Sequence, residues 1–163
     1  MTAGHSSDAA HVQHRRSADL DAATLYRILR LRVDVFVVEQ ACPYPELDGR
    51  DLEPDTRQFW IADDDGRVLA TLRLLVDPPA DDGSLVSRIG RVCTERSRRG
   101  QGMTARLLSA ALEIAGDHLC RIEAQAYLVD MYGKFGFVVE GEEYLEDGIP
   151  HVSMSRDPKA VSA

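Results

Sequence analysis

The residues best suited to chemistry lie in one stretch, "RVCTERSRRGQGMTARLL" (residues 91–108), where a strand-like run passes through arginines and glycines into an apolar helix. Five arginines stand against one acid there, so the stretch carries a net charge of +4 in a chain whose net charge is −8. The first turn of a helix offers free N–H groups and the positive end of the helix dipole, and glycine lets an anion approach the backbone. The stretch therefore predicts an anion-binding loop; the alternative is a loop that merely caps the helix.

Two common phosphate-binding loops do not fit this stretch. A Walker loop needs a glycine, four residues and then Gly-Lys-Ser/Thr, and no such string exists. A dinucleotide fingerprint needs a third glycine, but Ala105 stands at that position after Gly100 and Gly102. Nucleic acid is also disfavoured as a partner, because its phosphates require a basic face and this chain is acidic overall. The rest of the chain must therefore indicate which anion binds here.

The elements that position this loop follow from hydrophobic periodicity and turn residues. An apolar stripe from Leu25 to Phe36 predicts a helix that begins near Leu20, and the prolines and acids of residues 41–55 predict a loop. A second apolar stripe predicts a helix over residues 100–115. The order of elements predicts an α/β (α+β) fold, a mixed and mostly antiparallel sheet of about six to seven strands flanked by helices. The expected strands are residues 59–62, 67–76, 85–93, 120–126, 137–141 and 151–155.

The length of 163 residues suits a single domain, which we place at residues 19–157. Residues 1–18 are polar and lack an apolar period, so we expect a disordered N-terminal tail, and residues 158–163 are expected to form a C-terminal tail. Three histidines fall in the N-terminal tail without sharing one helical face, so no metal site is expected there: His5, His11 and His14.

Cysteine usage and hydropathy indicate a cytoplasmic protein. The three cysteines, Cys42, Cys93 and Cys120, show no metal-ligand spacing, and two of them lie in apolar strand-like runs, so we expect reduced thiols. No apolar stretch approaches the roughly 20 residues needed to cross a bilayer, and no segment has the pattern of a signal peptide. We therefore expect no membrane partner.

The anion-binding loop resembles that of a known family. "RGQGMT" (residues 99–104) resembles the Arg/Gln-x-x-Gly-x-Gly/Ala motif of the GCN5-related N-acetyltransferase (GNAT) family, although Thr104 replaces the small last residue. "AYLVDMYGKFGF" (residues 126–137) is similar to the family's Ala…Tyr-x-x-x-Gly-Phe element. The resemblance covers residues 20–157 and is closer still to the ElaA-like subgroup, through residues 32–40, 42–51, 89–92 and 146–151.

The resemblance implies the GNAT acyl-CoA N-acyltransferase fold, with acetyl-CoA as cosubstrate and no metal. In that family the loop amides clasp the pyrophosphate, and the strand before the loop parts from the next strand, so that pantetheine lies in the gap. Here the splayed pair would be residues 89–94 and 122–126. The residues that would contact the cofactor are Val92, Cys93, Thr94, Arg99, Gly100, Gln101, Gly102, Met103 and Thr104.

Acyl transfer to an amine needs a polarised thioester carbonyl, a base for the ammonium proton and an acid for the departing thiolate. The resemblance implies that an N–H near Cys93 or Thr94 polarises the carbonyl and that Tyr132 is the general acid. The alternative for Tyr132 is an aromatic side chain that packs beside Phe135 and Phe137.

The general base is the least determined part of the expected site. Many relatives place a glutamate on the strand before the loop, but this strand has no carboxylate. Glu39 or His151 is the first candidate, and Glu123 and Glu46 are weaker ones. Alternatively, Glu39 is an ion-pair partner of Arg32, and His151 is a turn residue.

Two acidic segments, residues 46–55 and 140–147, flank the expected acceptor side and favour a cationic acceptor. These features together predict an enzyme that moves an acetyl group from acetyl-CoA to a primary amine of a small basic molecule or a lysine-bearing peptide. Two alternatives stay open, a CoA-binding regulatory module without turnover and a related acyl transferase of the autoinducer-synthase type. Phe59 and Trp60 suit either the core or the contact of a homodimer.

Overall fold

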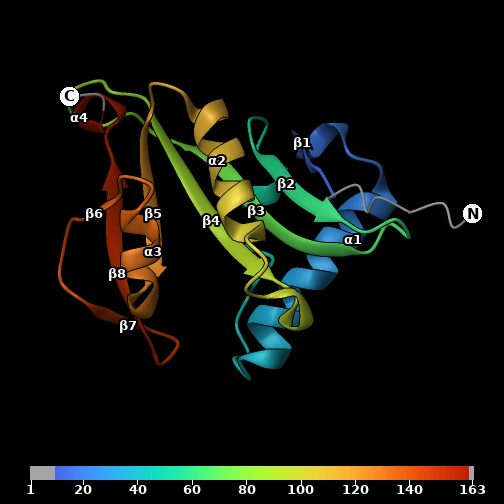
Figure 1. Cartoon of the computed structure of the whole chain (residues 1–163). Coiled ribbons are helices and arrows are strands. Elements are labelled where there is room, and N and C mark those ends of the chain that lie inside the picture. The colour runs from blue at the N-terminus through green and yellow to red at the C-terminus, as the bar shows by residue number, and fades with distance from the viewer. Residues whose placement is uncertain (1–9, 162–163) are drawn as a thin grey trace, which may run out of the picture.

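The computed structural model describes residues 10–161 and contains one mixed sheet of eight strands (Figure 1). The strand order is β1-β2-β3-β4-β5-β8-β6, and β7 pairs with β8 beside that path. Among the strand pairs of the described residues, only β4 and β5 run parallel, so the predicted mostly antiparallel sheet is confirmed. The strands span Val12–Arg16 (β1), Arg57–Ala62 (β2), Val68–Asp77 (β3), Val86–Thr94 (β4), Leu119–Gln125 (β5), Val138–Val139 (β6), Tyr144–Glu146 (β7) and Ile149–Arg156 (β8).

Two helices, α1 and α2, cover opposite faces of the sheet (Figure 1). The apolar stripe of α1 packs against a small core that includes Trp60 and Cys93, whereas α2 packs against a larger core that includes Phe59. Phe59 and Trp60 are 0% and 5% exposed, so both belong to the core and not to a subunit contact. The helices span Ala22–Val33 (α1), Met103–Ala115 (α2), Val129–Gly133 (α3) and Pro158–Val161 (α4), and a π-helical turn, Asp34–Glu39, extends α1.

The N-terminal segment joins the sheet. Residues of β1 pair antiparallel with β2, from Val12 opposite Ile61 to Arg16 opposite Arg57. The prediction of a disordered tail is therefore wrong for β1, because a strand ladder uses main-chain groups and tolerates the polar side chains that suggested disorder. Residues 1–9 lie outside the described residues, as do residues 162–163 of the expected C-terminal tail.

Two irregularities of β4 shape the candidate site. Thr71 of β3 lies opposite Cys93 and Arg73 lies opposite Gly90, so β4 has one extra residue, a β-bulge at Arg91 and Val92. On its other side, β4 pairs with β5 only from Val86 to Arg88. Beyond Arg88 the two strands diverge (Figure 1). The splayed strand pair predicted from the sequence is therefore present, and β4 has a free edge between Arg88 and the glycine loop.

Candidate active site

The glycine loop presents an uncapped helix N-terminus. Gly100 and Gly102 have φ angles of 79° and 78°, in the left-handed region that favours glycine. Asp21 caps α1 by accepting a hydrogen bond from the Thr24 N–H, but Gly102 at the start of α2 has no side chain to do this. A Cβ atom added at either glycine would meet nothing within 4 Å, so the space in front of the loop is open. The loop thus has the free N–H groups and the open approach that a phosphate group needs.

Arg99 ties the start of this loop to the end of β4. Its Nε donates to the carbonyl oxygen of Thr94 at 3.2 Å, and its Nη1 and Nη2 donate to the two carboxylate oxygens of Glu39 at 2.8 and 2.5 Å. The hydrogen bonds from Arg99 lower the pKa of Glu39. Glu39 is therefore held as an ionised partner of Arg99, and the predicted alternative that it pairs with Arg32 is wrong.

The end of β4 directs one backbone N–H toward the gap between the diverging strands. Glu95 donates its N–H to the Leu69 carbonyl on β3, and successive N–H groups of an extended chain point to opposite sides. The N–H of Thr94 therefore points away from β3, to the side from which β5 has diverged. The Thr94 hydroxyl lies 3.3 Å from that of Thr104, which links the strand end to the first turn of α2.

The thiol of Cys93 faces the core. Cys93 is 6% exposed and packs in the small core under α1. Burial raises its pKa to about 12, so the thiol is neutral near physiological pH. By the same alternation the N–H of Cys93 points toward β3, and its side chain has the character of the buried, unreactive thiol expected from the sequence.

Tyr132 lies on α3, just after β5. Its side chain is 4% exposed and contacts Phe137 edge-to-face, with 6.1 Å between the ring centroids. Burial raises the pKa of Tyr132, so the phenol keeps its proton. The aromatic packing expected from the sequence is therefore present, and the role of general acid stays a prediction.

Glu123 lies beside the point where β4 and β5 part. It is two residues beyond Arg121, the last β5 residue paired with β4. Its carboxylate accepts hydrogen bonds from Tyr144 at 2.5 Å, Ser153 at 2.6 Å and Arg88 at 3.1 Å. Burial alone would raise the pKa of Glu123, but these hydrogen bonds lower it below its ordinary value. The side chain is still 39% exposed, so this charged carboxylate is accessible.

His151 belongs to the same corner of the sheet. Its Nδ1 lies 2.7 Å from the Ile149 carbonyl oxygen, and its Nε2 lies 3.7 Å from a carboxylate oxygen of Glu146. The ring stacks on Tyr144, with 5.9 Å between centroids. Tyr144 therefore contacts both Glu123 and His151, and it brings together two of the four predicted base candidates.

Glu46, the fourth candidate, is buried in an ion-pair network. It is 3% exposed, and its carboxylate oxygens accept hydrogen bonds from Nε and Nη2 of Arg32 at 3.0 and 2.9 Å. Asp51 also accepts from Arg32, and Asp48 accepts from Arg73. The prediction of a cation-attracting acidic cleft from residues 46–55 is therefore wrong for these three acids, because arginines neutralise them.

The buried pairing of these arginines with Glu46, Asp48 and Asp51 was not predicted from the sequence, although a signal was present. Arg73 stands in the apolar run "LATLRLLV", and Arg32 falls on the apolar stripe of α1. A charged residue in a buried pattern indicates a partner.

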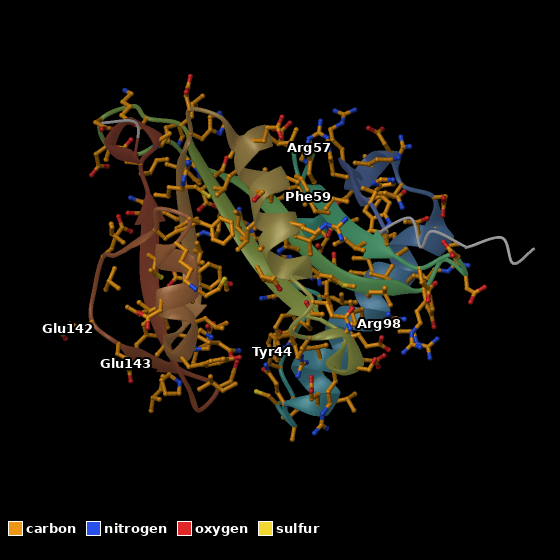
Figure 2. All side chains as sticks on the ribbon, in the orientation of Figure 1. Tyr44, Arg57, Phe59, Arg98, Glu142 and Glu143 are labelled. Atoms are coloured by element: carbon orange, nitrogen blue, oxygen red, sulfur yellow. The ribbon has the colours of Figure 1, made fainter. Side chains whose placement is uncertain are left out.

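The acids of the second acidic segment, residues 140–147, do not all face the gap between β4 and β5. Figure 2 shows Glu142 and Glu143 at the outer edge of the molecule, on the far side of β8 from the gap.

A groove of about 830 Å³ lies away from the gap between β4 and β5. It runs between α1, the π-helical turn and the turn that joins β2 to β3, and its lining holds four arginines and four acids. Glu39 and Arg96 belong to its wall. Because its charges balance, the groove lacks the excess of positive charge that would identify a phosphate site.

Comparison with known proteins agrees with this geometry. The family model described as "Acetyltransferase (GNAT) domain" matches residues 31–158. The chain belongs to the GNAT family. It is 61% identical over 138 residues to a UPF0039 protein of Mycobacterium tuberculosis, covering 85% of this chain and 87% of that protein. It is 38% identical over 151 residues to protein ElaA of Escherichia coli, covering 89% of this chain and 95% of ElaA. The predicted ElaA-like grouping is thus confirmed.

The chain also resembles solved structures with the GNAT fold. The crystal structure of an acyl-CoA N-acyltransferase from Pseudomonas aeruginosa superposes with a TM-score of 0.81 and 45% identity, covering 90% of this chain and 99% of that chain. The crystal structure of Escherichia coli ElaA gives a TM-score of 0.82 at 37% identity, covering 91% and 99%. An acyl-homoserine lactone synthase shares the fold, with a TM-score of 0.72 at 20% identity. These neighbours support an acyltransferase with the GNAT fold.

The described residues contain neither a helix that could cross a membrane nor a cluster of histidine, cysteine and acidic side chains that could hold a metal ion.

Proposed function

We propose that this GNAT protein is a cytoplasmic enzyme that transfers an acetyl group from acetyl-CoA to a primary amine, by direct attack of the amine on the thioester. The observation that carries the proposal is the continuity of β4. Its free edge begins after Arg88, passes the bulge, and leads directly into the loop with two left-handed glycines. An extended chain with a diphosphate at one end would fit both features, because it can lie along the free edge like an added strand.

Each part of the cofactor has candidate contacts. The N–H groups from Gly100 to Thr104 would bind the diphosphate, helped by the positive end of the α2 dipole. The edge from Val92 to Thr94 would bind the pantetheine amides, and the N–H of Thr94 is the candidate donor to the thioester carbonyl. A donor that is already oriented stabilises the negative charge that develops on that oxygen.

Tyr132 would donate a proton to the departing thiolate, a role favoured by the burial that keeps its phenol protonated. On the acceptor side, Glu123 is the preferred carboxylate. It pairs with Arg88, just as Glu39 and Glu46 pair with arginines, but it lies beside the parting of the strands. Its side chain is also the most exposed of the three, at 39% against 25% for Glu39 and 2% for Glu46. Because the pKa of Glu123 is low, it would hold the ammonium group and pass its proton to ordered water, with His151 close by through Tyr144.

The acceptor would be a cationic amine of a small molecule or a lysine-bearing peptide. This proposal now depends on Glu123 and on Glu146, which lies beside His151. Arginines neutralise Glu46, Asp48 and Asp51 of the other segment, and Glu142 and Glu143 lie at the outer edge of the molecule (Figure 2). One observation favours a second candidate, a CoA-binding module without turnover. Each of the four predicted bases already holds a hydrogen bond or lies close to an opposite charge within the protein.

The test is Tyr132→Phe, assayed by thiol release from acetyl-CoA over a panel of amines and by calorimetric titration with CoA. Phe keeps the contact with Phe137, so we expect kcat to fall about 100-fold or more while CoA affinity stays within about twofold. Tyr26→Phe, at an exposed position of α1, is the matched control. Unchanged turnover in Tyr132→Phe would remove the acid role. Binding of CoA without thiol release for any amine would favour the regulatory module, and a lack of binding would refute both.

A further inference from the structure

Arg91 has a backbone conformation that its residue type rarely adopts. Its φ is 53°, in the left-handed region, and it lies within β4. The other left-handed residues that are not glycine, Ala41 and Asp147, lie in turns between elements of residues 10–161. A β-bulge of this kind usually has glycine at its first position, because only glycine takes up this conformation without strain. Something in the fold must therefore hold an arginine there.

The side chain of Arg91 binds one short segment of the loop after α1. Its Nε lies 2.9 Å from a carboxylate oxygen of Glu46, and its Nη2 donates to the Glu46 carbonyl oxygen at 3.0 Å. The same Nη2 lies 3.4 Å from Asp48, and the guanidinium lies 5.6 Å from the ring centroid of Tyr44. Figure 2 shows Tyr44, which belongs to the loop after the π-helical turn, below the end of β4. Arg91 thus joins the bulge to residues 44–48.

That segment is itself fixed from the other side. Arg32 of α1, which is 0% exposed, binds Glu46 through two hydrogen bonds, and Arg73 of β3 binds Asp48 through two more at 2.8 and 2.6 Å. The three arginines and the carboxylates between them form one network that spans α1, β3, β4 and the loop. A guanidinium fork held at several points loses its freedom to rotate, so the network fixes the Arg91 backbone as well.

We propose that Arg91 is a positioning residue for acetyl transfer, in which its side chain, anchored on residues 44–48, holds the β4 bulge and thereby aims the backbone N–H groups that follow it into the gap. The physical reason is that successive N–H groups along a strand point to opposite sides. One extra residue reverses which side each following N–H faces, so without the bulge the N–H of Thr94 would point at β3 instead of the gap. This inference rests on the proposed function, because it assigns the bulge to the same thioester site.

The test compares Arg91→Gly with Arg91→Lys. Glycine accepts the left-handed backbone but removes the anchor, and lysine keeps a positive charge near Glu46 without the fork. We expect Arg91→Gly to lower kcat by about 10- to 100-fold, as for a reacting group misplaced by about 1 Å, with a change in KM for acetyl-CoA below about threefold. The kcat of Arg91→Lys should lie between that of Arg91→Gly and that of the unmodified protein. Arg57→Gly, another strand arginine changed to glycine, lies on β2 and is the matched control (Figure 2).

A second readout does not need turnover. Amide hydrogen exchange of residues 44–48 and 89–95 should be faster in Arg91→Gly than in the unmodified protein, and unchanged in Arg57→Gly. The inference is overturned if Arg91→Gly keeps full kcat, if its loss of kcat equals its unfolded fraction by circular dichroism, or if exchange in both segments is unaltered. Should the unmodified protein release no thiol with any amine, the proposed acetyl transfer fails, and the exchange comparison alone decides whether Arg91 fixes the bulge.

Discussion

Replacing Arg32 by methionine tests the buried network most directly. The Arg32 side chain is 0% exposed and donates four hydrogen bonds, two to Glu46 at 3.0 and 2.9 Å and two to Asp51 at 2.6 and 3.1 Å. Methionine has a similar length but no charge, so Arg32→Met leaves two carboxylates buried without this partner. Removal of one member of a buried ion pair costs about 3–5 kcal/mol in the free energy of unfolding. The whole free energy of unfolding of a typical domain is only about 5–15 kcal/mol.

The assay is urea unfolding near neutral pH, followed by circular dichroism. For a chain of this size each kcal/mol shifts Tm by about 2–4 °C, so a fall of roughly 6–20 °C should accompany the lower urea midpoint. Arg30→Met is the matched control on the same helix. The Arg30 side chain is 72% exposed and lies 4.0 Å from Asp34, and an exposed pair of this spacing contributes at most about 0.5 kcal/mol.

The difference in the free energy of unfolding between Arg32→Met and the unmodified protein should depend on pH. Burial alone would raise the pKa of Asp51, but the hydrogen bonds from Arg32 lower it overall, so Asp51 stabilises the unmodified protein above the ordinary carboxyl pKa and loses this effect as pH falls. In Arg32→Met the buried carboxyl should have a raised pKa, which reverses the trend. The difference between the two proteins should therefore be largest near neutral pH and shrink as pH falls through about 4 and below. A difference below about 1 kcal/mol, or one independent of pH, would refute this account of the network.

Two further predictions concern the glycine loop before α2. Gly102→Ala places a Cβ where nothing lies within 4 Å, so it should cost only about 1 kcal/mol of stability through its left-handed φ, yet weaken CoA binding at least about tenfold. Gly83→Ala, with a similar φ of 83° and the same free space, should show the stability cost without the loss of affinity in calorimetric titration. Glu39→Gln should tighten CoA binding by about 2- to 10-fold at low salt, because it removes a negative charge next to Arg99. A fall in kcat of about 100-fold in Glu39→Gln would instead restore Glu39 as the general base.

The parts of the site that could be predicted are those set by neighbours in the chain. The helix expected at residues 100–115 is α2, Met103–Ala115, because its apolar stripe repeats within single turns. The glycines before it lie in the left-handed region, as a loop that turns a strand into a helix requires. Family motifs in that loop and around Tyr132 then indicated the parted strands, which the pairing of β4 bears out.

The parts that could not be predicted depend on partners far away in the chain. Glu39 and Arg99 are 60 positions apart, and Arg32 reaches Asp51 across 19 positions. The sequence shows how many arginines and carboxylates the chain has, but not which arginine pairs with which carboxylate, because many pairings are possible for the same residues. The N-terminal strand escaped prediction for a related reason, because its order comes from main-chain pairing with β2 and not from an apolar pattern of its own.

The amino-acid sequence by itself determined the family, most of the elements from α1 onward and the glycine loop before α2, since glycine conformation and helical periodicity act over a few residues. Only the tertiary structure decided which acids stay accessible. It pairs Glu46 with Arg32 and Glu39 with Arg99, and it holds Arg91 in a left-handed bulge. It leaves Glu123 39% exposed beside the gap, although that carboxylate also pairs with Arg88. The physical reason is that burial and ion pairing are properties of distances in space, which the packing of α1, β3 and β4 sets.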